Sequence, residues 1–257
     1  MSAPWFHVDD LPGPGGSWPL SRDEAKHATG AKRLGPGDDV VLFDGSGRVA
    51  HGTLGGERGR DGSLPVLVHD VHVVERVGRR IHLACALPKG DRLSTMVDMT
   101  TQLGAASLTP LRCERSVVGE TDARAERIRR IQVEACKQAR CPWVPAFHHE
   151  TDVPSLARLG AANGRRSSSV ASRPEAPGDG EPRPSSSLVV LHPAGRPLQA
   201  LVPSLGADVT VAIGPEGGFT DAEVDLLVAA GALSLSVGAT ILRIETAAVV
   251  ATALLRG

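Results

Sequence analysis

The sequence predicts an α/β fold preceded by a small β-rich domain, and two observations support this. From residue 80 onward, short apolar runs typical of strands alternate with amphipathic stretches of helical period. Before that point, β-prone runs follow one another with only turn-forming stretches between them. Alternating strands and helices imply a mostly parallel sheet with helices on both faces. We therefore divide the chain into domains of residues 1–74 and 75–257.

The first domain contains three β-prone runs, at residues 40–43, 49–52 and 64–74. The sequence Asp-Gly-Ser-Gly at residues 44–47 has the composition of a hairpin loop joining the first two runs. A short helix is expected over residues 21–30. Ser21 is its expected cap, with Glu24 three residues later as in a capping box.

The second domain is predicted to alternate five strands with four helices. The expected strands are residues 81–87, 107–111, 188–192, 209–213 and 233–237, and the expected helices are 91–103, 122–140, 220–230 and 245–255. Thr220 and Glu223 form a capping box at the third helix start, and Gly104 follows the first helix as a stop signal. Residues 163–187 are rich in Ser, Pro, Arg and Gly and are expected to be a disordered insertion.

Composition excludes several classes of protein. No apolar run approaches the ~20 residues that cross a bilayer, and residues 1–10 lack the pattern of a secretory signal. The four cysteines include no CxxC pair, so reduced thiols are expected. The histidines, including His148 and His149, form no recognisable ligand set, and no metal is expected. These features predict a cytoplasmic protein with no membrane or metal partner.

The charge distribution contains one basic segment. Residues 75–140 hold 13 Lys and Arg against 8 Asp and Glu, a net of +5, whereas the whole chain has a net charge of −1. Such a segment is compatible with a face that contacts phosphates. A solvated helix surface is the simpler interpretation, and charge alone favours it.

Three glycine- or proline-containing segments follow predicted strands, at residues 191–195, 213–220 and 237–246. Open α/β sheets bind ligands beyond the carboxyl ends of their strands, and glycine lets backbone groups approach a ligand closely. These loops suit a flat, polar, nucleoside-like molecule. Neither GxxxxGK[ST] nor a GxGxxG after a strand is present, so P-loop and dinucleotide-binding Rossmann chemistry are not expected. From the residues alone, Gly-Pro-Glu-Gly-Gly is as compatible with a simple turn between a strand and a helix as with a ligand-binding loop.

Two C-terminal motifs closely resemble a known family. They are Ile-Gly-Pro-Glu-Gly-Gly-Phe-Thr at residues 213–220 with Glu223, and Val-Gly-Ala-Thr-Ile-Leu-Arg-Ile-Glu-Thr-Ala at residues 237–247. The chain is similar here to the RsmE family of 16S ribosomal RNA uracil-N3 methyltransferases in the SPOUT superfamily. Weaker similarity runs over nearly the whole chain, including His27, Lys89-Gly90-Asp91, Glu114-Arg115-Ser116 and Glu134-Ala135.

The resemblance implies a PUA-like β-barrel domain for RNA recognition, then a SPOUT-type catalytic domain with a C-terminal trefoil knot, in a homodimer. It implies S-adenosyl-L-methionine as cofactor and the 16S rRNA of the 30S subunit as partner. The cofactor-binding residues it implies are Leu191, His192, Pro193, Ile213, Gly214, Pro215, Glu216, Gly217, Gly218, Leu235, Val237, Gly238, Ile241 and Leu242.

The expected chemistry rests on Arg243 and Glu245. Uracil N3 is a poor nucleophile until its proton leaves, so Arg243 is expected to neutralise charge developing on the base. Glu245 is expected to accept the proton directly or through water. The alternative is that these two residues pair with each other or with a second subunit. His192 is expected to order its loop rather than to catalyse or bind metal, and Glu216 to organise its own loop.

Candidate RNA-binding residues are Arg33 and Arg115, with Arg130 and Arg140 from the basic helix. The chain departs from the family pattern at Met99 and Gln102, where the usual sequence is Lys-Ala-Thr-Glu-Leu-Gly, and at Trp5-Phe6, where an early Arg is usual. Three alternatives therefore stay open: a non-catalytic ribosome-associated RNA-binding protein, a SPOUT methyltransferase of another RNA, and an unrelated α/β enzyme.

Overall fold

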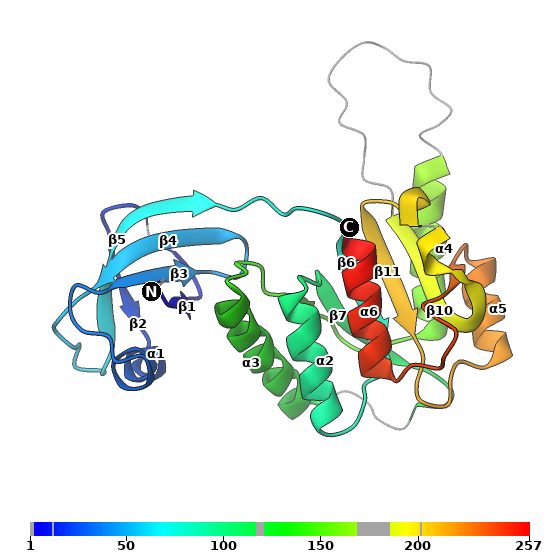
Figure 1. Ribbon diagram of the computed structural model, residues 1–257, viewed down its shortest axis with the longest axis horizontal. Coiled ribbons are helices and arrows are strands. Elements are labelled where there is room, and N and C mark those ends of the chain that lie inside the picture. The colour runs from blue at the N-terminus through cyan, green and yellow to red at the C-terminus, as the bar shows by residue number, and fades with distance from the viewer. Residues whose placement is uncertain (1–2, 12, 117–120, 169–185, 201) are drawn as a thin grey trace, which may run out of the picture. The chain divides into compact units, whose positions relative to one another are not determined.

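The computed structural model describes residues 3–11, 13–116, 121–168, 186–200 and 202–257, with the backbone alone for 162–168 (Figure 1). The chain forms two compact units. The first is Met1–Val77 with Gln132–Val144, and the second is Gly78–Ile131 with Pro145–Gly257. The stretch 132–144 thus belongs with the first unit, although it follows residue 75 in the chain. Among the described helices, none combines the length and the apolar character that crossing a membrane requires.

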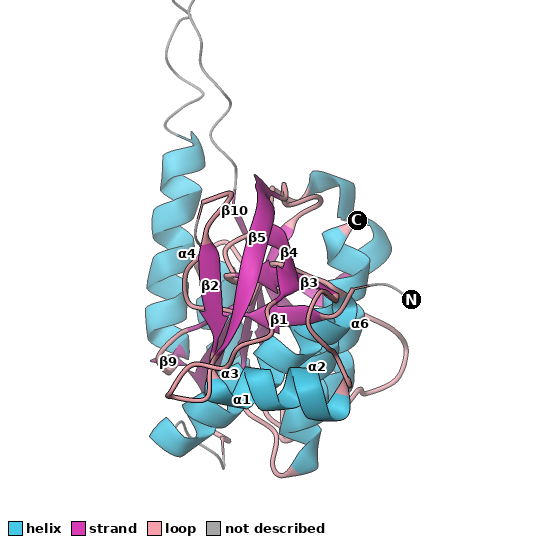
Figure 2. Cartoon of the chain, turned by 90° about the vertical axis from the view of Figure 1, so that its left-hand side faces the viewer, coloured by secondary structure: helices cyan, strands magenta, loops and turns pink. Residues whose placement is uncertain are grey.

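The first unit is built on a five-stranded sheet, whose strands are labelled in Figure 2. Its order is β1-β3-β4-β5-β2, with β1 parallel to β3 and the other pairs antiparallel. The strands are β1 (Trp5–His7), β2 (Ser17–Leu20), β3 (Asp39–Phe43), β4 (Arg48–Leu54) and β5 (Leu64–Val73). The three predicted strands and the hairpin between β3 and β4 are confirmed. The two short edge strands carry too little pattern to be predicted.

The two faces of this sheet are both covered. Side chains on the inner face, among them Phe6, Leu42 and Ala50, pack with the short helix α1 (Arg22–Lys26) and a following π-helical turn (His27–Ala31). Val41 on the outer face packs with Cys136, from the end of α3. Both faces are therefore apolar where protein covers them, which gives β3 its almost continuous run of buried residues.

Ser21 caps α1 as predicted and accepts a hydrogen bond from the backbone N–H of Glu24. The carboxylate of Glu24 does not complete a capping box, because it binds the ammonium group of Lys137 instead. Glu134 also contacts that ammonium group, at 2.8 Å. A tertiary ion pair has here replaced the local bond that the sequence spacing suggested.

The second unit contains a parallel sheet of order β12-β10-β11-β6-β7-β8, with β9 paired to β7. Every described pairing in it is parallel, as the alternation of strands and helices predicted. The strands are β6 (Arg80–Cys85), β7 (Ser107–Arg112), β8 (Ala146–Phe147), β9 (Thr151–Asp152), β10 (Ser186–Pro197), β11 (Asp208–Ile213) and β12 (Leu233–Ser236).

Helices cover both faces of this sheet. On one face α2 (Asp91–Gln102) and α6 (Ile244–Arg256) pack together, and Met96 and Ala248 join a core with Leu83 and Val211. Helix α3 (Asp122–Ala139) adds Ile128 to that core. On the other face, helices α4 (Val153–Ser168) and α5 (Asp221–Ala229) pack against smaller strand residues. The predicted helices are present, and α4 is an additional one.

The predicted insertion, residues 163–187, falls mostly outside the described residues, because 169–185 are not described. Its two ends differ from the expectation. Residues 163–168 continue helix α4, and Ser186 and Ser187 are the first residues of β10, paired with β11. These residues are too polar to predict regular structure by themselves. They adopt it because helix α4 propagates into one end and pairing with β11 extends the strand at the other.

Asp208 lies near the amino ends of two neighbouring strands. It accepts hydrogen bonds from Arg80 at 2.5 Å and His82 at 3.2 Å. Burial raises the pKa of Asp208, but the hydrogen bonds and charges of Arg80 and His82 outweigh that effect, so its pKa is held below its usual value.

A carboxyl group whose pKa is lower in the folded than in the unfolded state stabilises the fold at pH values above its unfolded-state pKa. This stabilisation is lost as the pH falls through the folded-state pKa. We therefore expect Asp208→Asn to lower the free energy of unfolding by roughly 1 kcal/mol at pH 7. The difference from the unsubstituted protein should shrink below about pH 4. Urea denaturation across pH checks this, and a difference that stays constant down to acid pH would contradict it.

Candidate functional site: a pocket at the carboxyl ends of three strands

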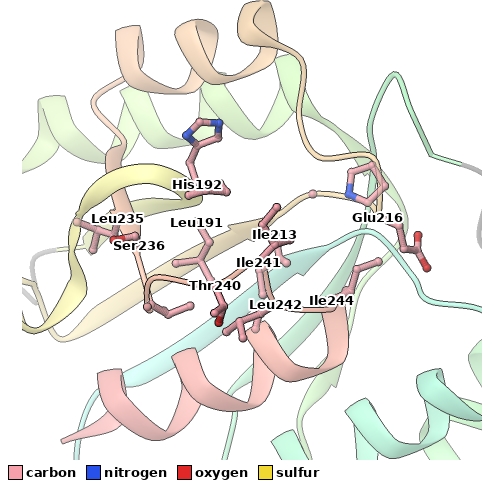
Figure 3. Close-up of a pocket in the computed structure, with 16 residues that line it drawn as sticks. Leu191, His192, Ile213, Glu216, Leu235, Ser236, Thr240, Ile241, Leu242 and Ile244 are labelled. Carbon is pink, nitrogen blue, oxygen red and sulfur yellow. The ribbon is translucent and has the colours of Figure 1, made fainter.

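A pocket lies where β11 and β12 end and where β10 bulges, and side chains from all three strands converge on it (Figure 3). It encloses about 660 Å³ of space, part of it open to solvent. Its lining residues are Leu191, His192, Pro193, Ile213, Gly214, Pro215, Glu216, Leu235, Ser236, Val237, Gly238, Thr240, Ile241, Leu242, Ile244 and Ala247. The three neighbouring strands bring together loops that are far apart in the sequence, because the carboxyl ends of parallel strands share one edge.

Strand β10 does not end at residue 192 as predicted, but bulges sharply at the pocket and continues to Pro197. Leu191 and Arg196 both pair with Leu235 of β12, so residues 192–195 leave the ladder between them. The ring of His192 accepts a hydrogen bond from the backbone N–H of Ala194 at 3.3 Å, which holds the bulge in shape. Gly195 returns the chain so close to β12 that a Cβ there would lie 2.6 Å from backbone atoms of Leu235. The expectation that His192 orders its loop agrees with this contact.

The loop after β11 is a tight turn that opens helix α5. The N–H of Gly218 donates to the carbonyl of Pro215 at 2.8 Å, and Gly218 has a φ of +70°, which favours glycine. Thr220 and Glu223 form the predicted capping box at the start of α5. A local chemical signal in the sequence thus fixes where this loop ends and the helix begins.

Glu223 also reaches beyond its own helix. Its Oε1 accepts a hydrogen bond from the backbone N–H of Glu114 at 2.8 Å, while Oε2 accepts from the backbone N–H of Thr220 at 2.8 Å. In the same contact region Arg115 donates to the carbonyl of Gly217 at 2.8 Å. One carboxylate therefore ties the loop after β7 to the loop after β11.

A second link reaches this loop from helix α2. Arg92, in the first turn of α2, lies 3.2 Å from the carboxylate of Glu216. Figure 3 shows that carboxylate directed away from the labelled side chains of the other strand ends. The geometry agrees with the expectation that Glu216 organises its loop.

Arg243 and Glu245 lie where the third loop enters helix α6. Arg243 is exposed and occupies the N-cap position, and Ile244 beside it lines the pocket. Among the described residues, neither Arg243 nor Glu245 takes part in an ion pair, so their pairing with each other is not seen within this chain. The Oε2 atom of Glu245 is buried and has no hydrogen-bond partner there.

Two of the expected cofactor residues lie outside the pocket lining, and their contact with a cofactor also stays a prediction. Gly217 and Gly218 do not line the pocket, since Gly217 faces Arg115 and Gly218 forms the turn. The other expected residues all line it, and their binding of a cofactor stays a prediction. Sequence reasoning missed Ser236, Thr240, Ile244 and Ala247. The last two belong to the start of α6, where the helical period would have placed both residues on the side facing the strand ends.

Cys85 and Cys113, the two cysteines of the second unit, have pKa values that disfavour the thiolate. All four are free thiols, as expected from the sequence. Burial, with a smaller effect from Cys113, raises the pKa of Cys85 to about 12. Burial and then the charge of Glu223 raise the pKa of Cys113 to about 12. Methyl transfer through a cysteine thiolate is therefore not supported by either residue.

The four candidate RNA-binding arginines are all exposed. Arg33 and Arg140 belong to the first unit and have φ values of +56° and +53°, in the left-handed region that non-glycine residues seldom adopt. Arg130 lies on the α3 segment of the second unit, and Arg115 lies beside Gly217 next to the pocket. Their exposure leaves them accessible to phosphate groups, and RNA contact stays a prediction.

Substituting Glu223 tests the link between the two loops. We expect Glu223→Ala to lower the free energy of unfolding by about 1–2 kcal/mol, because the cap of α5 and the bond to Glu114 are lost together. Chemical denaturation measures this. Asp225→Ala is the matched control, since Asp225 is an exposed carboxylate on the same helix. Equal destabilisation by the two substitutions would show that the link contributes nothing.

Comparison with known proteins agrees with this architecture. The sequence matches the RNA methyltransferase domain family over residues 75–256 and the RNA methyltransferase PUA domain family over residues 20–62. It is 29% identical to a Mycobacterium bovis protein named Ribosomal RNA small subunit methyltransferase E, over 98% of this chain and 90% of that protein.

Two solved structures share the fold over nearly their full length. A Legionella pneumophila protein, solved with the bound cofactor SAM, superposes with a TM-score of 0.80 at 26% identity, covering 99% of this chain and 97% of that one. A ribosomal RNA small subunit methyltransferase E from Neisseria gonorrhoeae, bound to S-adenosyl methionine, superposes with a TM-score of 0.79 at 22% identity, covering 98% and 96%. With a PUA-like half-barrel, a parallel α/β catalytic domain and both family matches, the chain belongs to the RNA methyltransferase family.

Proposed function

We propose that this protein transfers the methyl group of S-adenosylmethionine to N3 of a uracil in 16S ribosomal RNA. The observation that carries the proposal is the pocket formed by the bulge of β10 and the loops after β11 and β12, with Arg243 and Glu245 flanking the pocket-lining Ile244 at the start of α6. Relatives named Ribosomal RNA small subunit methyltransferase E support the choice of the small-subunit RNA. The uracil N3 position follows from the resemblance of the two C-terminal motifs.

The pocket residues fit the cofactor. Apolar side chains such as Leu191, Ile213 and Leu242 offer flat surfaces for an adenine ring, and the glycine-containing loops expose backbone groups to its polar edges. When bound, the cofactor supplies an electrophilic methyl group on a sulfonium. The chain must therefore hold the acceptor nitrogen in line with that methyl group and exclude competing water.

Arg243 and Glu245 supply what the uracil requires. Arg243, exposed beside the pocket lining, stabilises negative charge on the base oxygens as the N3 proton leaves. Glu245 accepts that proton at a carboxylate oxygen, directly or through water.

RNA binding is assigned to Arg33, Arg115, Arg130 and Arg140. In the first unit, a hollow places Lys32 and Arg140 beside the ring of Trp5, and three acidic residues, Asp38, Asp39 and Glu134, line the same hollow. Positive charges bind phosphates in a salt-dependent way. A ring supports stacking with an unpaired base. The target uracil must leave its stack to reach the pocket.

We further propose that the protein is a homodimer, carries a C-terminal trefoil knot and acts in the cytoplasm on ribosomal particles. The dimer is supported by exposed apolar side chains on two helices that pack side by side. Met99 of α2 is 42% exposed and Leu254 of α6 is 39% exposed. Met99 replaces a lysine of the family pattern, a change that adds apolar surface to this face.

The departures at Met99 and Gln102 do not favour a non-catalytic protein. Neither residue lines the pocket, and the amide of Gln102 donates to Asp98 on the same helix at 2.9 Å. The catalytic candidates Arg243 and Glu245 are both retained. We therefore prefer methyl transfer to RNA binding alone.

The test incubates the protein with methyl-labelled S-adenosylmethionine and 30S subunits from cells lacking the enzyme, with naked 16S RNA in parallel. Label on N3 of one uracil in the small-subunit RNA is the expected result. Comparison of the two substrates shows whether the assembled particle is required. Cofactor binding without label on either substrate would overturn the proposal, and label on another RNA would reassign the substrate.

A further inference from the structure

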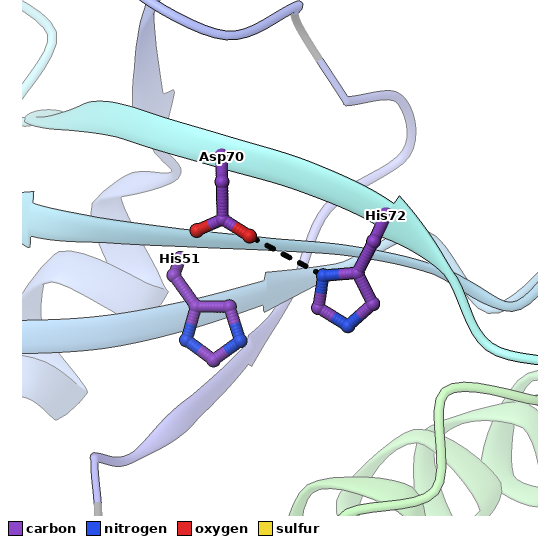
Figure 4. A group of neighbouring side chains, drawn as sticks. All are labelled: His51, Asp70 and His72. Carbon is purple, nitrogen blue, oxygen red and sulfur yellow. Dashed lines mark hydrogen bonds and ion pairs between the residues drawn. The ribbon is translucent and has the colours of Figure 1, made fainter.

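Two histidines and an aspartate meet on one exposed patch of the first unit. His51 comes from β4, and Asp70 and His72 come from β5 (Figure 4). One ligand atom from each side chain lies within 4.8 Å of the other two. The Nδ1 atom of His72 lies 3.4 Å from a carboxylate oxygen of Asp70, and the two imidazole rings stack at 5.5 Å with an angle of 15°.

A β-bulge brings these three residues to the same face. Gly52 pairs with Val68 and His51 pairs with Asp70, so His69 is an extra residue on β5 without a direct partner. Before the bulge, Val66 and Val68 point into the core, and after it Val71 does so. The extra residue therefore reverses the phase of the strand. Asp70 and His72 point outward beside His51, whereas an uninterrupted ladder would have placed His69 opposite His51.

The chemistry of this group is that of a transition-metal site. Neutral imidazole nitrogens and a carboxylate oxygen are ligands that suit zinc. Three protein ligands leave a fourth tetrahedral position for water. In such a site the ligand atoms lie roughly 3.3 Å apart, given zinc bonds of about 2.0 Å. Rotation of exposed side chains can close the remaining distance.

We propose that His51, Asp70 and His72 bind Zn²⁺. Among the described residues they are the one such group of histidine, cysteine and carboxylate side chains. None of them lines the candidate cofactor pocket, so the site is independent of the proposed methyl transfer. A bound ion would join β4 to β5 across the bulge, where the backbone ladder is interrupted.

The competing explanation is that these three side chains bind no ion. In that case only the stacking of the two rings and the bond between Asp70 and His72 hold them together. All three side chains are exposed, so substituting any of them should leave the fold intact. His69 supplies a matched control, because it is an exposed histidine on the same strand that is not part of the group.

The test titrates Zn²⁺ into the untagged full-length protein by calorimetry and records the absorption spectrum with Co²⁺ in its place. We expect one ion per chain with a tetrahedral Co²⁺ spectrum. His51→Ala and His72→Ala should each weaken binding at least about tenfold, since even the outer partners of metal ligands contribute that much. Asp70→Asn should weaken it as well, and His69→Ala should leave it unchanged.

A thermal unfolding series with and without Zn²⁺ gives a second readout. The ion should raise the midpoint of the unsubstituted protein and of His69→Ala, but not that of His51→Ala or His72→Ala. Absence of Zn²⁺ binding, or equal binding by His51→Ala, His72→Ala and His69→Ala, would overturn the proposal. Binding that depends on Cys136 and Cys141 instead would place the ion elsewhere and overturn it too.

Discussion

Replacing Arg243 with alanine is expected to lower kcat for methyl transfer about 10²–10³-fold, the usual cost of removing one group that stabilises developing negative charge. Cofactor affinity should stay unchanged, because Arg243 is exposed and is not one of the pocket-lining residues. Single-turnover methylation and calorimetric titration of S-adenosylmethionine measure the two quantities separately. Arg243→Lys should recover part of the rate, since it keeps the charge but not the planar group.

Arg158→Ala is the matched control for this substitution. Arg158 is exposed on α4, and its described side-chain bond is to Ser155 of the same helix. Glu245→Gln should also lower kcat, and its deficit should shrink at alkaline pH, where the base loses its N3 proton without help. A loss of cofactor affinity equal to the loss of kcat in Arg243→Ala would instead assign Arg243 to cofactor binding.

Replacing Gly195 with alanine is expected to have the largest effect on the pocket itself. The new Cβ would lie 2.6 Å from backbone atoms of Leu235, and a backbone cannot rotate away as a flexible side chain can. Strands β10 and β12 must then separate at the point where both line the pocket. We expect a loss of about 1–3 kcal/mol in the free energy of unfolding, as for other overpacked sites.

Cofactor affinity should fall together with stability in Gly195→Ala. Urea denaturation and cofactor titration of the same preparation measure both effects. Gly30→Ala is the matched control, because a Cβ at Gly30 meets nothing within 4 Å and its φ is not in the left-handed region. If Gly195→Ala binds the cofactor as well as Gly30→Ala does, the close approach of β10 and β12 is not required for the pocket.

Local patterns were sufficient for the elements that frame the site. The strands 107–112 and 208–213 and the helices α2, α5 and α6 follow from apolar periodicity and from caps, because these signals act between residues a few positions apart. Thr220 and Glu223 illustrate this, since each satisfies a backbone group of the other. The motifs at residues 213–220 and 237–247 also indicated the family and most of the pocket lining.

Other features depend on contacts between distant residues. Glu24 was spaced to cap its own helix but binds Lys137, because an ammonium group more than a hundred residues away is the stronger partner. Glu223 was recognisable as a cap, and its bond to Glu114 was not. Strands β1 and β2 are three and four residues long and exist through pairing with longer neighbours.

The sequence by itself therefore determined the order and type of most elements, the family, and the loops that converge on the pocket, since periodicity, caps and motifs are local. Only the tertiary structure decided which of those residues line the pocket and which partners Glu24 and Glu223 choose. It also decided that His51 meets Asp70 and His72, which the spacing of histidines did not predict. The reason is physical: that meeting requires the pairing of two strands and a one-residue bulge that reverses the side-chain phase, and neither is encoded in any short stretch of sequence.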